Sequence, residues 1–258
     1  MDIKILVAAH KEAKMPTDKN LYLPIHVGAA LHPELRLGYQ SDATGDNISL
    51  KNGSYNELTA IYWAWKNLNA DAIGLVHYRR LLSLNHKKSF SSVLSNHEAQ
   101  LLLKTHAIIL PKKRHYWIET NYSHYVHAHY RNPIDECRRV ILDLYPDYIP
   151  FYDVVMKLRS AHMFNVFIMR KDLFDEYCQW MFSILSELEG RIDTSKYDAY
   201  ESRVIGFVSE LLLDVWLNKN GYDFKEVNCL FMEKQNWLIK GMNFLKRKLT
   251  GFQVSENE

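Results

Sequence analysis

The sequence predicts an α/β fold in which a central, mostly parallel sheet is flanked by helices. Short apolar runs of strand length alternate with longer segments whose apolar residues recur every three or four positions. This alternation is typical of strands that pair in parallel through helical crossovers. The 258 residues, 47% of them hydrophobic, are enough to bury one large core, and the sequence has no repeat or linker. We therefore predict a single domain over residues 1–258.

The first half supplies the predicted strand, helix, strand order. The run from Lys4 to Ala9 predicts the first strand, and residues 39–53, rich in turn formers, predict a loop. A helix is expected next, with Ser54 as its cap, Glu57 completing a capping box, and an apolar stripe from Leu58 to Leu68.

Further elements follow from the same patterns. The predicted strands are residues 73–76, 107–110 and 163–169, and the predicted helices are 133–144, 171–188 and 203–217. The segment Asn121 to Tyr130, rich in His and Tyr, is expected to be a loop on the acceptor side of a binding site.

Composition excludes several classes of function. A net charge of +2, from 32 basic and 30 acidic residues, argues against a nucleic-acid partner. The three cysteines, Cys137, Cys178 and Cys229, form no Cys-x-x-Cys pair, which argues against disulfides and thiolate zinc sites. This use of cysteine is typical of the reducing cytoplasm, where we expect the protein. No signal-like or membrane-spanning segment is present, so we expect it to be soluble or peripherally bound to a membrane.

The strand at residues 73–76 carries the main chemical signal. It leads directly into His77, Arg79 and Arg80, and ligands bind at the carboxyl ends of strands in α/β sheets. Paired arginines at such a position suggest an anion, most simply a diphosphate. The alternative is that one arginine pairs with a surface carboxylate while the other is solvated.

Five motifs together carry a resemblance. They lie at Ile5–Lys11, Gly45–Ser49, Glu57–Asn67, Gly74–Arg80 and Phe164–Met169. Between residues 4 and about 217 the chain resembles a bacterial family of capsular and exopolysaccharide glycosyltransferases, long catalogued as a domain of unknown function, which includes galactofuranosyltransferase domains. The motif order is also similar to that of the GT-A fold.

The resemblance implies a GT-A-like enzyme. It would transfer a sugar, galactofuranose or galactose, from a UDP-sugar to a growing, lipid-linked surface polysaccharide, with inversion at the anomeric carbon. One departure stands out, since His77-Tyr78-Arg79 occupies the place where the GT-A fold usually has the metal-binding Asp-x-Asp motif. Cationic side chains can neutralise a leaving diphosphate directly. We therefore expect no metal and no cofactor beyond the donor substrate.

The donor site is expected to combine residues from several segments. Small residues at the end of the first strand would admit a nucleobase, although an alanine pair is also common in buried strands. The Gly-Asp-Asn loop could bind hydroxyl groups or be only a turn. A buried amide such as that of Asn165 needs a partner. The predicted donor-binding residues are Ala8, Ala9, His10, Lys11, Asp46, Asn47, Ser49, Arg79, Arg80 and Asn165.

Transfer with inversion needs a general base. Glu210, an acid among apolar neighbours on the predicted 203–217 helix, is the candidate, and His77 is the second predicted catalytic residue. The alternative for Glu210 is an ion pair with Arg203. The predicted acceptor-binding residues are His124, Tyr125, His129 and Arg203, and the spacing of the histidines argues against zinc.

Residues 234–252 combine Trp, Phe and Leu with lysines. Such a segment can lie on the inner face of the cell membrane as an amphipathic tail, or pack on the domain as a terminal helix. Two other functions stay open: a noncatalytic module that binds carbohydrate or nucleotide sugar, and a metal-dependent hydrolase built on the histidines.

Overall fold

The computed structural model describes residues 1–233 of the chain. Eight strands in this range form one mixed sheet in the order β3-β2-β1-β4-β5-β10-β6-β9, in which β4 also pairs with β9. Their bounds are β1 Ile3–Ala9, β2 Tyr22–His26, β3 Gln40–Ser41, β4 Ala72–His77, β5 Arg80–Ser83, β6 Ile108–Pro111, β9 Phe167–Arg170 and β10 Phe224–Phe231. A small second sheet pairs β7 Arg114–His115 with β8 Ser160–Ala161.

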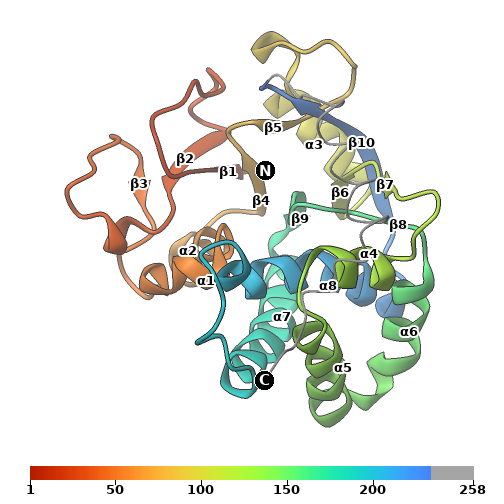
Figure 1. Cartoon of the computed structure of the whole chain (residues 1–258). Helices are drawn as coiled ribbons and strands as arrows, with labels where there is room; N and C mark the ends of the chain where they lie inside the picture. Colours follow the sequence, from red (N-terminus) through yellow and green to blue (C-terminus); the bar gives the residue numbers. More distant parts are fainter. Residues whose placement is uncertain (234–258) are drawn as a thin grey trace.

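Helices cover both faces of the main sheet (Figure 1). The α-helices are α1 Asn52–Tyr55, α2 Leu58–Asn67, α3 Asn96–Thr105, α4 Asn121–Ala128, α5 Asn132–Leu144, α6 Ile149–Lys157, α7 Lys171–Arg191 and α8 Val204–Asn220. Alternate residues of β1 enter different cores: Leu6 and Ala8 join the large core with α2, α5, α6, α7 and α8, whereas Ile5 and Val7 join the smaller core with α3.

The predicted α/β class is confirmed, but the sheet is mixed. β1 pairs in parallel with β2 and with β4, and β2 with β3. In the other half, β6 and β10 pair in parallel, whereas β9 runs antiparallel to β4 and β6, and β5 antiparallel to β4 and β10. The expectation of a mostly parallel sheet therefore holds for the half that contains β1 to β4, and the other half is mixed.

Three local expectations were wrong. The strand expected from residue 163 begins at Phe167, and the segment expected to be a loop from Asn121 to Tyr130 starts with helix α4. The capping box expected at Ser54 does not form, because Ser54 lies inside α1 and the backbone reverses at Asn56, with φ of 52°. The predicted tail at 234–252 lies outside the described residues, and the single domain over 1–258 stays a prediction.

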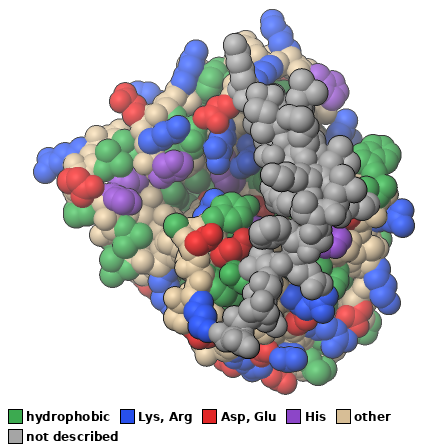
Figure 2. All heavy atoms as spheres, in the orientation of Figure 1, with side chains coloured by type: hydrophobic (Ala, Val, Ile, Leu, Met, Phe, Trp, Pro, Cys, Tyr) green, Lys and Arg blue, Asp and Glu red, His purple; other side chains and the backbone are tan. Residues whose placement is uncertain are grey.

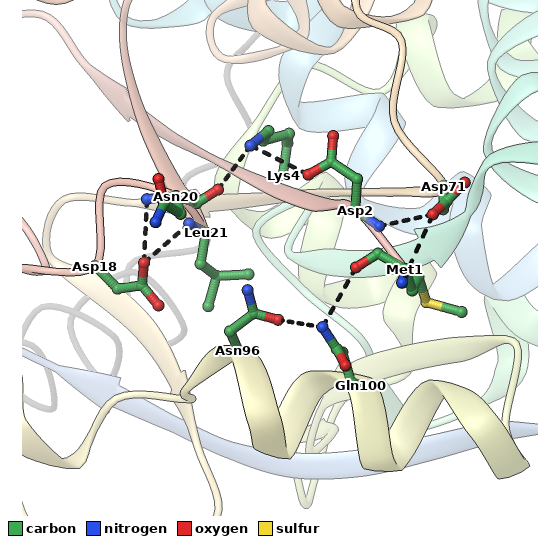
Figure 3. A network of polar contacts seen from close by, with 9 residues as sticks. All are labelled: Met1, Asp2, Lys4, Asp18, Asn20, Leu21, Asp71, Asn96 and Gln100. Carbon is green, nitrogen blue, oxygen red and sulfur yellow. Dashed lines mark hydrogen bonds and ion pairs between the residues drawn. The ribbon is translucent and has the colours of Figure 1, made fainter.

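Polar contacts fix the amino-terminal end of β1 (Figure 3). The backbone N–H of Asp2 donates to the Asp71 carboxylate at 2.6 Å, and Lys4 Nζ donates to the carbonyl of Asn20 at 2.8 Å. Gln100 of α3 donates to the carbonyl of Met1 at 3.3 Å. These contacts join the start of β1 to the neighbouring segments. The candidate residues His10, Arg79 and Arg80 follow the opposite, carboxyl ends of β1 and β4.

Within residues 1–233, no helix has the length and apolar character needed to cross a membrane.

Candidate active site

The carboxyl ends of β1 and β4 lie side by side, as the sequence predicts. The strands pair in parallel with Ala8 opposite His77, and the N–H of Tyr78 donates to the carbonyl of Ala8 at 3.3 Å. The ring of His10 meets the Tyr78 ring edge-on at 5.9 Å, and Lys11 Nζ lies 5.5 Å from the centre of that ring. Of the predicted donor-binding residues, those at the end of β1 therefore lie close to those after β4.

The two arginines after β4 make few contacts with protein acceptors. In the part of the chain that the structure describes, the Nε atoms of Arg79 and Arg80 are buried without a hydrogen-bond partner. The Arg80 guanidinium lies 4.0 Å from the centre of the Phe164 ring, and Arg79 Nη1 approaches the Glu233 carboxylate only to 3.8 Å. Burial, then the neighbouring Arg79, lowers the pKa of Arg80. A bound anion would relieve both costs.

More cations surround this strand end. Burial lowers the pKa of His10, and the charges of Arg79, Lys11 and Arg203 lower it further. Figure 2 shows Lys, Arg and His side chains interspersed with Asp and Glu side chains on this face of the molecule. The group formed by His10, Lys11, Arg79 and Arg80 is suited to a polyanionic ligand such as a diphosphate.

A strained turn lies opposite the arginines. Phe164 and Asn165, which precede β9, have φ of 75° and 52°, a region that residues with side chains rarely adopt. Each such residue costs roughly 1 to 3 kcal/mol, and such strain clusters at functional sites. The Asn165 amide donates to Glu57 at 2.8 Å and to Ser209 at 3.0 Å. Asn165 is thus buried as predicted, but in a turn and with protein partners.

The backbone of Phe164 lies between both predicted catalytic residues. Its carbonyl lies 2.8 Å from His77 Nε2, and its N–H donates to the Glu210 carboxylate. Because a carbonyl oxygen only accepts, Nε2 of His77 carries the proton and Nδ1 of a neutral ring keeps its lone pair. Burial is the main cause that lowers the pKa of His77, which favours this neutral form.

Glu210 has the electrostatic character of a general base. Burial and the nearby Glu57 carboxylate raise its pKa to about 7, against the opposing effects of Arg80, the Phe164 N–H and Arg114. A carboxylate with a pKa near neutrality can accept a proton from a hydroxyl group more readily than an ordinary one. Arg203, the alternative partner for Glu210, instead donates from Nε to Asn56 at 2.7 Å.

The predicted acceptor residues are divided between three environments. His129 stacks on the Phe207 ring at 4.1 Å, and the Arg203 guanidinium lies 5.3 Å from that ring, one helical turn before Glu210. His124 has other contacts: its ring stacks on Tyr116 at 3.9 Å and its Nδ1 lies 2.8 Å from Glu119. Tyr125 is buried in the large core.

The loop residues predicted to bind the donor have partners within the protein, in their own loop and on α2. Ser49 is buried and donates to Asp42, which also accepts the N–H groups of Gly28 and Ala29. The Asn47 side chain accepts the Ser49 N–H at 3.1 Å, and Asp46 accepts the Tyr62 hydroxyl at 3.3 Å. Their role toward the donor stays a prediction.

Three functional candidates were missed from the sequence. Glu57, interpreted as a capping residue, lies near Glu210 and accepts the Asn165 amide. The buried Tyr116 hydroxyl has no partner within residues 1–233, and its pKa is raised mainly by burial and partly by the Glu210 carboxylate. Arg114 lies on β7, and its charge lowers the pKa of Glu210. Glu57 was missed because it belongs to a sequence typical of a capping box. No local pattern indicates a functional role for Tyr116 or Arg114.

A buried network joins the segment before the strained turn to α8 and β10. His162 Nδ1 lies 2.5 Å from Asp214, one helical turn after Glu210, and the His162 N–H donates to the same carboxylate at 2.9 Å. His162 Nε2 lies 3.0 Å from Glu226 of β10. These bonds, with that from Phe164 to Glu210, fix the turn against α8.

Among the described residues, no group of three or more His, Cys, Asp or Glu side chains has an arrangement that could hold a metal ion. Metal independence itself stays a prediction, which rests on the type of residue at the end of β4.

Comparison with known proteins gives two matches. Residues 4–221 match the family described as a domain of unknown function, DUF4422, whereas no curated protein matches the sequence. The apo structure of WbbM, a bifunctional glycosyltransferase, is 32% identical, with a TM-score of 0.83. The match covers 91% of this chain and 46% of WbbM, so the chain spans about half the length of that protein. This chain belongs to the DUF4422 family.

Proposed function

We propose that the chain is a glycosyltransferase that transfers a sugar from a UDP-sugar to a glycan acceptor. One observation carries the proposal: two arginines whose Nε atoms have no partner within residues 1–233 follow β4, and across the Phe164 turn lies Glu210, whose burial raises its pKa to about 7. Glycosyl transfer needs these two functions together, an anion site for the leaving group and a base for the acceptor. The likeness to the bifunctional glycosyltransferase WbbM supports it.

On the donor side, Arg79 and Arg80 bind the diphosphate. A guanidinium presents a planar fork to two phosphate oxygens and stays charged at any working pH. Lys11 and His10 of the adjoining strand end add donors or positive charge close to Arg79. The arginines then neutralise the departing UDP in place of a metal ion, in a GT-A-like arrangement of the site.

On the acceptor side, Glu210 removes the proton of the attacking hydroxyl. The acceptor oxygen forms the bond to the anomeric carbon as the bond from that carbon to the diphosphate breaks, and UDP leaves on the opposite face. The anomeric configuration is therefore inverted. Neutral His77, whose Nε2 is fixed by the Phe164 carbonyl, presents Nδ1 to a sugar hydroxyl.

The substrates follow from the resemblance. We propose galactofuranose or galactose as the donor sugar, and a growing, lipid-linked capsular or exopolysaccharide chain as the acceptor. His129 and Arg203, which converge on Phe207, are the residues of the proposed acceptor site nearest to Glu210 along α8. Such an acceptor would place the enzyme in the cytoplasm, on the inner face of the cell membrane.

Release of UDP tests this proposal. The full chain is incubated with UDP-galactose, UDP-galactofuranose or UDP-glucose, with and without oligosaccharide acceptors, and UDP is measured. We expect release from one donor, accelerated by acceptor and lost in Glu210→Gln. UDP binding without release from any donor would indicate the noncatalytic module, and hydrolysis of other substrates that stops on chelation would indicate the metal-dependent hydrolase.

A further inference from the structure

The connection between β7 and α4 displays two large apolar side chains to solvent. Trp117 is 80% exposed and Ile118 is 56% exposed. Trp117 has φ of 58°, and the N–H of Ile118 donates to the carbonyl of Tyr116 at 2.6 Å. A hydrogen bond from the N–H of one residue to the carbonyl two residues earlier, with a positive φ at the residue between them, defines the strained form of the γ-turn. The backbone at Trp117 is therefore strained, and the side chain of Trp117 points toward solvent.

The rest of the molecule holds this turn in place. The N–H of Tyr116 donates to the carbonyl of Arg159 at 2.8 Å, and Arg159 Nη1 donates to the carbonyl of Trp117 at 3.1 Å. On one side β7 pairs with β8, and on the other Thr120 caps α4. Because its backbone is anchored on both sides, the exposure of the tryptophan is a property of the fold.

The charge around the turn is positive. Lys112, Arg114 and His115 are exposed on the same segment. The nearest acid in the sequence, Glu119, is buried and lies 2.8 Å from both His124 and His127. An exposed tryptophan and isoleucine beside exposed cations match the interface of a bilayer, where indole rings lie at the level of the headgroups and cations meet anionic lipid.

We propose that residues 112–118, the basic tryptophan loop, contact the surface of a bilayer that contains anionic lipid. Trp117 and Ile118 enter the interface, and Lys112 lies against the headgroups. A carbohydrate ligand would explain the tryptophan, but neither the exposed isoleucine nor the cations around it. The contact does not depend on the proposed function, although it suits an enzyme with a lipid-linked acceptor.

Sedimentation with vesicles tests this contact. The full chain is mixed with vesicles of phosphatidylcholine, with or without phosphatidylglycerol. We expect binding only to the anionic vesicles. Trp117→Gly, which suits a positive φ and relieves the strain, should weaken binding roughly tenfold, and Lys112→Ala roughly fivefold. Leu50→Ala is the matched control, since Leu50 is 70% exposed outside the loop and its loss should change nothing.

Two results would overturn the proposal. These are failure of the wild type to bind anionic vesicles, and vesicle binding that is unchanged in Trp117→Gly. If vesicle binding is unchanged and Trp117→Gly raises the KM for a soluble oligosaccharide acceptor, the loop is a platform for the acceptor. UDP binding by Trp117→Gly should equal that of the wild type, so this test is separate from that of the proposed function.

Discussion

Replacement of Glu210 by glutamine should lower kcat for sugar transfer by roughly 10²- to 10⁴-fold, the usual contribution of a general base. Glutamine keeps the shape of the side chain and can still accept the Phe164 N–H, but it cannot take a proton. In the wild type, kcat should rise with pH through about 7, because only the ionised carboxylate is a base. Steady-state kinetics over a series of pH values measures both effects.

The same substitution should stabilise the fold above neutral pH. The raised pKa means that folded Glu210 keeps its proton up to a pH of about 7, whereas the unfolded chain loses it near 4.5. Stability from this group is therefore highest below 4.5 and falls as the pH rises toward 7. Glu210→Gln removes that cost, and urea unfolding at pH 8 should show a gain of roughly 1 to 3 kcal/mol.

Glu57→Gln is the matched control. It removes the like charge that raises the pKa of Glu210 and keeps an acceptor for the Asn165 amide. The rise of kcat with pH should therefore shift to lower pH, with activity retained. Loss of activity in Glu57→Gln together with full activity in Glu210→Gln would show that Glu57 is the base.

Arg80→Ala should weaken UDP binding by roughly 1.5 to 3 kcal/mol, or about 10- to 150-fold, as expected for loss of a charged hydrogen bond. Arg79→Ala should have an effect of the same kind, reduced by the contact of Arg79 with Glu233. Arg80→Lys should recover little affinity, because an ammonium cannot form the two parallel bonds of a guanidinium. Calorimetric titration with UDP measures all three variants.

Two further measurements separate a role in phosphate binding from a general loss of structure. Arg138→Ala removes an arginine whose partner is Asp153 on α6, and it should leave UDP binding unchanged. Arg80 also lowers the pKa of Glu210, so Arg80→Ala should move the rise of kcat to higher pH. If neither Arg79→Ala nor Arg80→Ala lowers the affinity for UDP, the arginines do not bind the phosphates.

The end of β4 could be predicted from the sequence because its signal is local. An apolar run that ends in His77, Arg79 and Arg80 specifies both the strand and the residues at its carboxyl end. The pairing of β1 with β4 then followed from the strand, helix, strand order. The opposite wall of the site could not be predicted, since the turn at Phe164 and Asn165 depends on bonds to β4, α2 and α8.

The capping signature Ser-x-x-Glu shows how tertiary contacts decide between equal local patterns. It occurs at Ser54 and again at Ser95, but only Ser95 forms the capping box, with Glu98. After Ser54 the chain reverses at Asn56. The Asn56 side chain accepts a hydrogen bond from Arg203 Nε and donates one to the Arg203 carbonyl. Because of that reversal, Glu57 does not cap a helix and lies in the candidate active site, near Asn165 and Glu210. No pattern within residues 54–57 could reveal a partner so distant in sequence.

The central claim is that protein cations after β4, and not a metal ion, hold the diphosphate of the donor. Calorimetric titration of the wild type with UDP tests it most directly, first in excess EDTA and then with manganese. We predict the same affinity under both conditions, with a large loss in the Arg79→Ala, Arg80→Ala double variant. Binding that requires manganese and is indifferent to both arginines would contradict the claim.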